Sequence, residues 1–587
     1  MKEETSSAIT KKDLIVLLHG FNGSADNMKY INAIILNKWR RQGRSDPILV
    51  IPSMPLSLTA FSDPYLITKE VFDQINSTWE NNKNNIEDIY FIGHSTGALI
   101  ARKVYIYACG QTPRVPFDPL FIGSAAVPWA SRVKRIVLLS AMNRGWTISP
   151  HLSLKNAFVW GIGNLLGNII MMCSNKIPLV FNIRRGAPFL TQLRLEWMAM
   201  RRRAAESPDV AGSAITVQLL GTIDDMVSPE DNIDLVAGDD FYYFDVPGSG
   251  HSNIIETNDT PVGNQRRRRV EMALTASKER LEQYSILPAD HNEPTREPRV
   301  TDVVFVIHGI RDQGYWTQKI ARRVVALARA RNKNIDKIMN TTTVPVVKTI
   351  VKTETSSYGY FAMLPFLLPH IRRRRVEWLL DRYATNQALY PNAEFSFIGH
   401  SHGTYMLAKA LQSYSGVYFK HVIFAGSVVR TDFDWKTMFH QGRVKTMVNF
   451  VATADWVVAL FPKTFQTLSI PDLGSAGHDG FNSNKTFNLR YVTGEHSAAL
   501  QEKYWRDIAR FILDGKVPTL QPAACRQSRI VRTLGTFSPL VLLAILAVAL
   551  GLGAIFYCLG SHLGQGRWGE AALAIYLLLI WKVVTWF

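Results

Sequence analysis

Two segments of the chain, IYFIGHSTGALIARKVY at 89–105 and FSFIGHSHGTYMLAKAL at 395–411, repeat nearly the same pattern. Each is an apolar run that ends in Gly-His-Ser-x-Gly and continues with helical spacing. The glycines allow a strand to turn sharply into a helix, and this strained turn lifts the serine hydroxyl clear of a sheet. The repetition predicts a duplicated strand–turn–helix unit with candidate nucleophiles at Ser95 and Ser401.

The length of the chain leaves room for two such units. With 587 residues, we expect two or more domains, each with a complete hydrophobic core. The segment 288–300 contains three prolines and mixed charge, which is the composition of a linker. We therefore expect one domain at 1–287 and a second at 301–515.

The first half contains the other groups that a serine nucleophile needs. The segment 13–23, DLIVLLHGFNG, predicts a buried strand that runs into a His-Gly turn, where backbone N–H groups can face a reacting carbonyl. Later predicted strands end at Asp224 and Asp225, and at a glycine-rich turn with His251. Catalytic groups gather at the carboxyl ends of parallel strands. The order serine, acid, histidine supplies a base and a group that orients it.

On these motifs the first half resembles the α/β-hydrolase superfamily, in its lipase and esterase branch, over about 13–284. The resemblance implies an α/β fold with a mostly parallel sheet covered by helices on both faces, and neither a metal nor an organic cofactor. It implies Ser95 as nucleophile, Asp224 as acid and His251 as base. Asp224 is preferred to Asp225 because it has the family's G-x-x-D-x-x-V spacing. The implied oxyanion-hole donors are the backbone N–H groups of Thr96 and of Phe21 or Asn22.

The second half repeats these motifs and resembles bacterial α/β-hydrolases that begin with an HGIR segment, here 308–311. The resemblance implies a second triad of Ser401, Asp455 and His496. The implied oxyanion-hole donors are the N–H groups of His402 and of Ile310 or Arg311. A degenerate copy that keeps the fold without the chemistry is the alternative. His478 is a rival base, although we expect it to be a solvated loop histidine.

The two halves differ in the distance along the sequence from the candidate serine to the candidate acid. This distance is 129 residues in the first half and 54 in the second. The extra residues predict an insertion at about 146–205, within which 156–175 contains no charged residue. A single membrane crossing there would separate Ser95 from Asp224, so we expect a lid over the site.

Three arginine runs contribute to a net charge of +18 and are expected to form solvated helix faces, with anionic lipid headgroups as an alternative partner. The runs lie at 201–203, 266–269 and 372–375. Nucleic acid would also suit the charge, but no nucleic-acid-binding motif accompanies it.

The C-terminal part predicts a membrane anchor. The stretch 537–559 is a 23-residue apolar segment, long enough to cross a hydrocarbon core of about 30 Å. A second apolar segment near the C-terminus predicts a hairpin of two transmembrane helices at 537–587, after a basic linker at 516–536. Arginines before the first span favour cytoplasmic catalytic domains. With no predicted signal peptide and four scattered cysteines, we expect a bacterial inner membrane and a reducing compartment.

The sequence thus predicts a membrane-anchored serine hydrolase that cleaves carboxylic esters, in particular acyl lipids, through a serine–histidine–aspartate triad and an acyl-enzyme. A protein acyl-thioesterase is the enzymatic alternative. A membrane-tethered scaffold built from two inactive hydrolase folds is the alternative from another class. The sequence predicts no oligomeric state.

Overall fold

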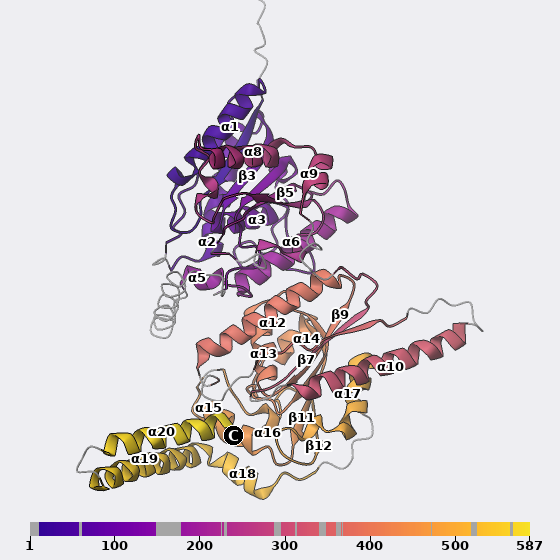
Figure 1. Cartoon of the computed structure of the whole chain (residues 1–587). Helices are drawn as coiled ribbons and strands as arrows, with labels where there is room; N and C mark the ends of the chain where they lie inside the picture. Colours follow the sequence, from indigo (N-terminus) through magenta and orange to yellow (C-terminus); the bar gives the residue numbers. More distant parts are fainter. Residues whose placement is uncertain are drawn as a thin grey trace, which may run out of the picture. The chain divides into compact units, whose positions relative to one another are not determined.

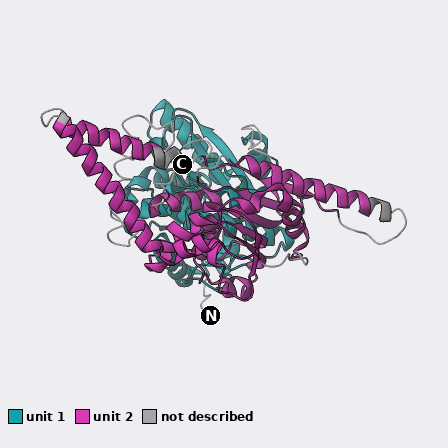
Figure 2. Ribbon diagram, turned by 90° about the horizontal axis from the view of Figure 1, so that it is seen from below, with its two compact units in different colours: residues 1–296, 380–389 teal, residues 297–379, 390–587 magenta. Residues whose placement is uncertain are grey.

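The computed structural model divides into two compact units, shown in two colours in Figure 2. Unit 1 comprises Met1–Arg296 and Leu380–Leu389, and unit 2 comprises Glu297–Leu379 and Tyr390–Phe587. The structure describes residues 11–57, 61–147, 178–224, 226–227, 232–286, 295–310, 314–339, 348–359, 366, 368–470, 472–517, 525–563 and 568–586. The domain limits drawn from the sequence stay predictions.

Unit 1 contains a sheet of six parallel strands in the order β2-β1-β3-β4-β5-β6. The strands are β1 (Lys12–Leu18), β2 (Ile48–Val50), β3 (Ile86–His94), β4 (Val133–Leu139), β5 (Ile215–Gly221) and β6 (Phe241–Val246). Because all six run in one direction, their carboxyl ends meet at one edge of the sheet, and Ser95, Asp224 and His251 all follow such ends.

Helices cover both faces of this sheet (Figure 1). The helices are α1 (Lys29–Arg41), α2 (Pro64–Asn82), α3 (Thr96–Ala108), α5 (Leu179–Asn182), α6 (Pro188–Glu206), α8 (Pro261–Thr275) and α9 (Lys278–Tyr284). Side chains of β1 alternate between the two faces, as in any strand that is buried on both sides. Leu14 and Val16 pack in the core with α2, α3 and α6, whereas Ile15 and Leu17 pack in the core with α1 and α8.

Unit 2 repeats the strand order with its own six parallel strands, β8-β7-β9-β10-β11-β12. The strands are β7 (Asp302–Ile307), β8 (Val351–Glu354), β9 (Glu394–His400), β10 (Phe419–Ala425), β11 (Val444–Ala452) and β12 (Phe487–Val492). The helices of this unit are α10 (Tyr315–Met339), α13 (His402–Ser413), α14 (Trp435–His440), α15 (Trp456–Thr467), α16 (Ala476–Asp479) and α17 (Glu502–Asp514). Helix α12 (Pro369–Leu389) belongs to unit 2 as far as Leu379 and to unit 1 from Leu380. The predicted fold class, two parallel α/β sheets with helices, is confirmed.

Three helices end the chain: α18 (Arg529–Thr536), α19 (Ser538–Leu563) and α20 (Gly569–Trp586). Figure 1 draws α19 and α20 side by side, and the Tyr576 hydroxyl donates a 2.5 Å hydrogen bond to the Ala549 carbonyl between them. Among the described residues, the 25 residues Ser538–His562 form the one helix long and apolar enough to cross a membrane. That α20 is a second span stays a prediction.

The predicted insertion at 146–205 does not form a lid over its whole length. Helix α6 occupies its C-terminal part, and Leu190, Leu193 and Trp197 of this helix are fully buried in the core against the sheet. Those residues therefore belong to the body of the unit and do not form a lid. The uncharged stretch 156–175 lies outside the described residues.

The expectation that the arginine runs form solvated faces is wrong for several members. Arg266 and Arg372 are buried, and Arg201 donates hydrogen bonds to the Ala214 carbonyl and the Thr216 hydroxyl. A guanidinium group has five N–H donors, so it can be buried where several carbonyl groups converge on it. These runs therefore stabilise the fold, at least in part.

Candidate active site

The turn that carries Ser95 has the strained geometry that the sequence predicts. Ser95 has φ 52° and ψ −119°, between the end of β3 and the start of α3. A Cβ added at Gly93 would lie 2.6 Å from the Ala98 Cα, and one added at Gly97 would lie 2.4 Å from the His19 carbonyl oxygen. Only glycine fits at these two positions, so the sequence Gly-x-Ser-x-Gly follows from the packing of the turn.

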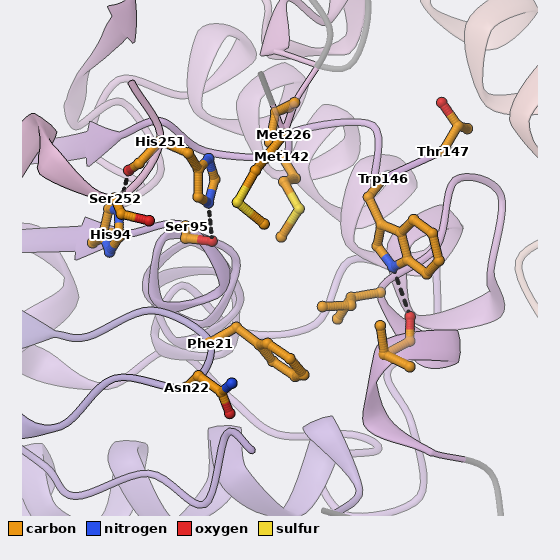
Figure 3. A pocket seen from close by; sticks show the side chains of 13 residues that line it. Phe21, Asn22, His94, Ser95, Met142, Trp146, Thr147, Met226, His251 and Ser252 are labelled. Atoms are coloured by element: carbon orange, nitrogen blue, oxygen red, sulfur yellow. Dashed lines mark hydrogen bonds between the residues drawn. The ribbon is translucent and has the colours of Figure 1, made fainter. Parts of the chain in front are cut away.

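Three predicted residues form a connected set of hydrogen bonds. Ser95 Oγ lies 2.8 Å from His251 Nε2, and His251 Nδ1 lies 3.1 Å from Asp224 Oδ2 (Figure 3 draws the first bond). In the tautomer with its proton on Nδ1, His251 donates to the carboxylate and accepts from the serine hydroxyl. This is the arrangement in which histidine removes a proton from serine.

The acid is held by the backbone as well as by the histidine. Asp224 Oδ1 accepts hydrogen bonds of 3.0 Å from both the Met226 and Val227 N–H groups. Burial acts to raise the pKa of the Asp224 carboxyl, but the hydrogen bond and charge of His251 and the two N–H groups outweigh it and lower the pKa. The group is therefore a carboxylate at neutral pH. Asp225, the alternative acid, lies outside the described residues.

Two backbone N–H groups beside Ser95 are available to an oxyanion. Neither the Phe21 N–H nor the Thr96 N–H donates to a described residue. The Asn22 N–H, by contrast, donates a 2.6 Å hydrogen bond to the Leu56 carbonyl, with Asn22 at φ 55°. Of the two donors left open by the sequence, the geometry therefore favours Phe21, together with Thr96.

An apolar cavity of about 260 Å³ opens onto Ser95 (Figure 3). Trp146 lines this cavity, and its indole N–H donates a 2.8 Å hydrogen bond to the carbonyl of Val180, another lining residue. The cavity is lined by Phe21, Asn22, His94, Ser95, Met142, Trp146, Thr147, Val180, Ile183, Met226, Val227, His251 and Ser252. Its side walls suit an aliphatic group next to the reacting carbonyl.

Two polar residues fix the backbone around His251, and neither role was predicted from the sequence. His94 Nε2 donates a 2.8 Å hydrogen bond to the His251 carbonyl. Burial, with a smaller effect from the charge of His251, lowers the pKa of His94 to about 4, so it is a neutral donor and not a proton carrier. Arg266 binds the same loop through Ser249 Oγ at 2.8 Å and the Glu256 and Gly248 carbonyls at 3.0 and 3.1 Å.

The second candidate site has the same turn but a different set of hydrogen bonds. Ser401 has φ 50° and ψ −117°, close to the values of Ser95. His496 Nδ1 lies 3.0 Å from both carboxylate oxygens of the buried Asp455. Ser401 Oγ makes no hydrogen bond with His496 or another described side chain. The structure therefore brings acid and histidine together and leaves the serine unconnected.

The remaining predicted residues of unit 2 are those of the oxyanion hole and the rival base His478. His402 and Ile310 flank the serine turn, His402 as the first residue of α13 and Ile310 after β7, while Arg311 lies outside the described residues. Burial, followed by the charges of Arg372 and Arg375, lowers the pKa of His402. His478 is not the predicted solvated loop histidine, because it lies on α16 with 1% of its surface exposed.

One family model matches the chain. Residues 8–120 match "Putative serine esterase (DUF676)", a stretch that includes Phe21 and Ser95 and ends before Asp224 and His251. A search of curated proteins finds no match. With the two parallel sheets and the serine turn, this match identifies a serine hydrolase of the ester-cleaving type.

Similar solved structures include lipases. Monoglyceride lipase from Saccharomyces cerevisiae is 12% identical, with 47% of this chain and 88% of that chain covered and a TM-score of 0.29. Monoacylglycerol lipase from Paleococcus ferrophilus is 15% identical, with 46% and 97% covered and a TM-score of 0.27. Phospholipase PlaB from Legionella pneumophila in complex with thio-NAD is 14% identical, with 36% and 37% covered and a TM-score of 0.24. Likenesses at this level do not identify a substrate.

Proposed function

We propose that this serine hydrolase is anchored to a membrane and cleaves carboxylic esters of acyl lipids at Ser95. The observation that carries the proposal is the chain of hydrogen bonds from Ser95 through His251 to Asp224 at 2.8 and 3.1 Å, beside an apolar cavity. A hydroxyl becomes a nucleophile only when a base is aligned with it, and the cavity favours an aliphatic acyl group over a polar one.

The proposed reaction is acyl transfer in two steps. His251 Nε2 takes the proton of Ser95 as Oγ bonds to the ester carbonyl carbon, and the Phe21 and Thr96 N–H groups bind the oxyanion. The protonated histidine then gives its proton to the departing alcohol, which leaves an acyl-serine. Water, deprotonated by the same histidine, attacks this ester and releases the carboxylic acid and the free serine. The Asp224 carboxylate stabilises the imidazolium in both steps.

Helix α19 supports the proposed anchor. Its 25-residue span would be about 37 Å long at 1.5 Å per residue, which exceeds the roughly 30 Å of a hydrocarbon core. The proposed orientation places both hydrolase units in the cytoplasm. Fractionation with carbonate washing tests the anchor, since a chain that ends at Thr536 should leave the membrane fraction.

We propose further that Ser401, Asp455 and His496 form a second, independent site. Its support is the serine turn, which has nearly the same φ and ψ as that of Ser95, together with the paired acid and histidine. The absence of a hydrogen bond between Ser401 and His496 is the observation that argues against a second site. Fluorophosphonate labelling with peptide mass spectrometry should find both serines, with Ser95→Ala abolishing only the first label and Ser401→Ala only the second.

The activity is tested by comparing the lipids of cells that produce the wild type with those of cells that produce Ser95→Ala. Acyl lipids that fall only with the wild type, and free fatty acids that rise, would support the proposal. Loss of protein-bound acyl groups without change in lipids would favour the thioesterase alternative. A chain that no fluorophosphonate labels would favour the scaffold alternative.

A further inference from the structure

The segment that leads to α19 runs along the catalytic edge of unit 2. The Cys525 N–H donates a 3.0 Å hydrogen bond to the Arg490 carbonyl in the edge strand β12. The Ser528 N–H then donates a 2.9 Å hydrogen bond to the Thr453 carbonyl, two residues before Asp455. Because Thr453 follows the carboxyl end of β11, the chain reaches the sheet edge at which Ser401, Asp455 and His496 lie.

Helix α18 and the first turn of α19 are packed onto this edge. Val531 and Ser538 are 7% and 0% exposed, and a Cβ added at Gly535 would lie 3.2 Å from His478 Nε2 and 3.4 Å from Lys463 Nζ. Both helices contact α15, whose N-terminus is capped by Asp455 through a 3.0 Å bond from the Val458 N–H. The apolar helix therefore begins at a fixed place beside the helix that carries the catalytic acid.

The exposed side chains around this junction are of two kinds. Trp456 at the start of α15, Ile530 on α18 and Phe537 before α19 are 45%, 73% and 53% exposed. Three arginines of the same segment are also exposed, at positions 526, 529 and 532. Aromatic and apolar side chains next to basic ones are typical of the membrane–water interface, where the former enter the acyl boundary and the latter bind anionic headgroups.

We propose that these six residues form the membrane-docking face of unit 2, and that the face holds the site of Ser401 at the headgroup level of the bilayer. The substrate of this site is then an amphiphilic ester that enters from the membrane and not from solution. The inference rests on the proposed serine chemistry and on the proposed anchor. The face comprises Trp456, Arg526, Arg529, Ile530, Arg532 and Phe537.

A bilayer fits this face better than a second copy of the chain would. Helix α19 continues directly from it and, if it enters a bilayer, brings the surface of that bilayer within a turn of Phe537. The three arginines would repel the same arginines of a copy in a symmetric dimer, whereas anionic headgroups would neutralise them.

The test uses the full-length chain in vesicles of phosphatidylcholine and phosphatidylglycerol, with two fluorophosphonates that differ only in their alkyl group. One has a long chain and partitions into the vesicle, and the other is an ethyl compound that stays in water. In each case serine displaces fluoride from phosphorus and keeps the phosphonyl group, so mass spectrometry gives the labelling rate at Ser401 and at Ser95 of the same molecule.

Ile530→Glu and Trp456→Glu should each lower the labelling of Ser401 by the long-chain probe at least tenfold, which is the lower end of the effect of losing one buried apolar side chain. Labelling by the ethyl probe should stay within twofold in Ile530→Glu, which shows that the site is intact. Phe487→Glu is the matched control, because Phe487 is 46% exposed at the opposite, amino-terminal end of β12. It should leave both rates unchanged.

Equal loss in Ile530→Glu and Phe487→Glu, or no loss in either docking variant, would overturn the docking face. A concentration-dependent dimer that dissociates in Ile530→Glu would assign the face to a second copy instead. Labelling of Ser95 without labelling of Ser401 by either probe would also overturn the inference, while the proposed function at Ser95 stands. Failure of both serines to react would instead refute the proposed function.

Discussion

Replacing the acid of the first site tests its mechanism most directly. In Asp224→Asn, the Asn Oδ1 can keep the two 3.0 Å hydrogen bonds from the Met226 and Val227 N–H groups. Its NH₂ group then takes the place of Oδ2, 3.1 Å from His251 Nδ1. Because the amide donates, Nδ1 must accept, and the only proton of a neutral His251 moves to Nε2. That nitrogen faces Ser95 Oγ at 2.8 Å and can no longer take its proton.

The expected loss is large because both the tautomer and the charge are wrong. The same exchange in a serine protease lowers kcat by about 10⁴, which corresponds to roughly 5.5 kcal/mol of transition-state free energy. We expect a similar fall in the acylation rate of Ser95 by a short p-nitrophenyl ester, measured in a Ser401→Ala background so that only one site reacts. Thermal unfolding should change little, since the backbone hydrogen bonds to the side chain remain.

The control is the neighbouring acid. Asp225→Asn should keep the acylation rate within about threefold of the parent, because the G-x-x-D-x-x-V spacing and the bond to His251 both belong to Asp224. A rate that falls more in Asp225→Asn than in Asp224→Asn would refute the assignment. A fall of less than tenfold in Asp224→Asn would refute the role of the carboxylate itself.

Three further outcomes are expected for unit 1. Arg266→Lys should lower kcat for ester hydrolysis by about tenfold, because lysine cannot make all three hydrogen bonds that the guanidinium group makes to the loop of His251. Arg268→Lys, at an exposed position of the same helix, should leave kcat unchanged. In Gly97→Ala the new Cβ would lie 2.4 and 2.5 Å from two backbone carbonyl oxygens. This change should lower the free energy of unfolding by at least about 2 kcal/mol, as overpacking a core does, and should abolish fluorophosphonate labelling of Ser95. Burial lowers the pKa of His94 to about 4, so between pH 6.5 and pH 4 the unfolded chain binds a proton there and the folded chain does not. The free energy of unfolding should therefore fall by about 3 kcal/mol through this group as the pH is lowered over that range. Urea titrations of His94→Gln should show a smaller fall.

Local pattern was enough to predict the strands, the serine turns and the three residues of unit 1 that hydrogen bonds connect, Ser95, His251 and Asp224. The glycines at 93 and 97 have one physical cause, the contact of the turn with α3 and with the loop after β1, and this cause is visible as spacing in the sequence. The order of acid and histidine follows from strand ends that share one edge of a parallel sheet. Such features depend on residues near one another in sequence or on the direction of strands.

Features that depend on long-range packing were not predictable in this way. Arg266 belongs to a run of four arginines, and nothing in the run indicates that one member points into a loop 10 to 18 residues away. Helix α6 mixes apolar and charged side chains, a composition that suits a lid or a core equally, and only its position against the sheet decides between them. His478 is buried because α18, more than 50 residues later, packs beside it.

The two sites differ at one position that explains why their histidines lie differently. The Ser95 N–H donates to the Leu139 carbonyl and the Ser401 N–H to the Ala425 carbonyl, so the residues that follow these acceptors, Ser140 and Gly426, correspond. Both have positive φ, 44° and 54°. In unit 2, however, a Cβ at Gly426 would lie 2.7 Å from His496 Nδ1 and Cε1. The His496 ring therefore occupies space that a side chain fills in unit 1.

Gly426→Ser, which installs the residue of unit 1, should therefore displace His496 from Asp455. Since the new Cβ would also meet the His496 carbonyl at 2.9 Å, the ring cannot escape by rotation alone and the loop must move. We expect fluorophosphonate labelling of Ser401 to fall at least tenfold, while Ser95 in the same molecule keeps its rate. Ser140→Gly, the reciprocal change, removes only a hydroxymethyl group and should leave labelling of Ser95 within threefold. Unchanged labelling of Ser401 in Gly426→Ser would mean that its reactivity does not depend on the observed position of His496, and that another base serves the second site.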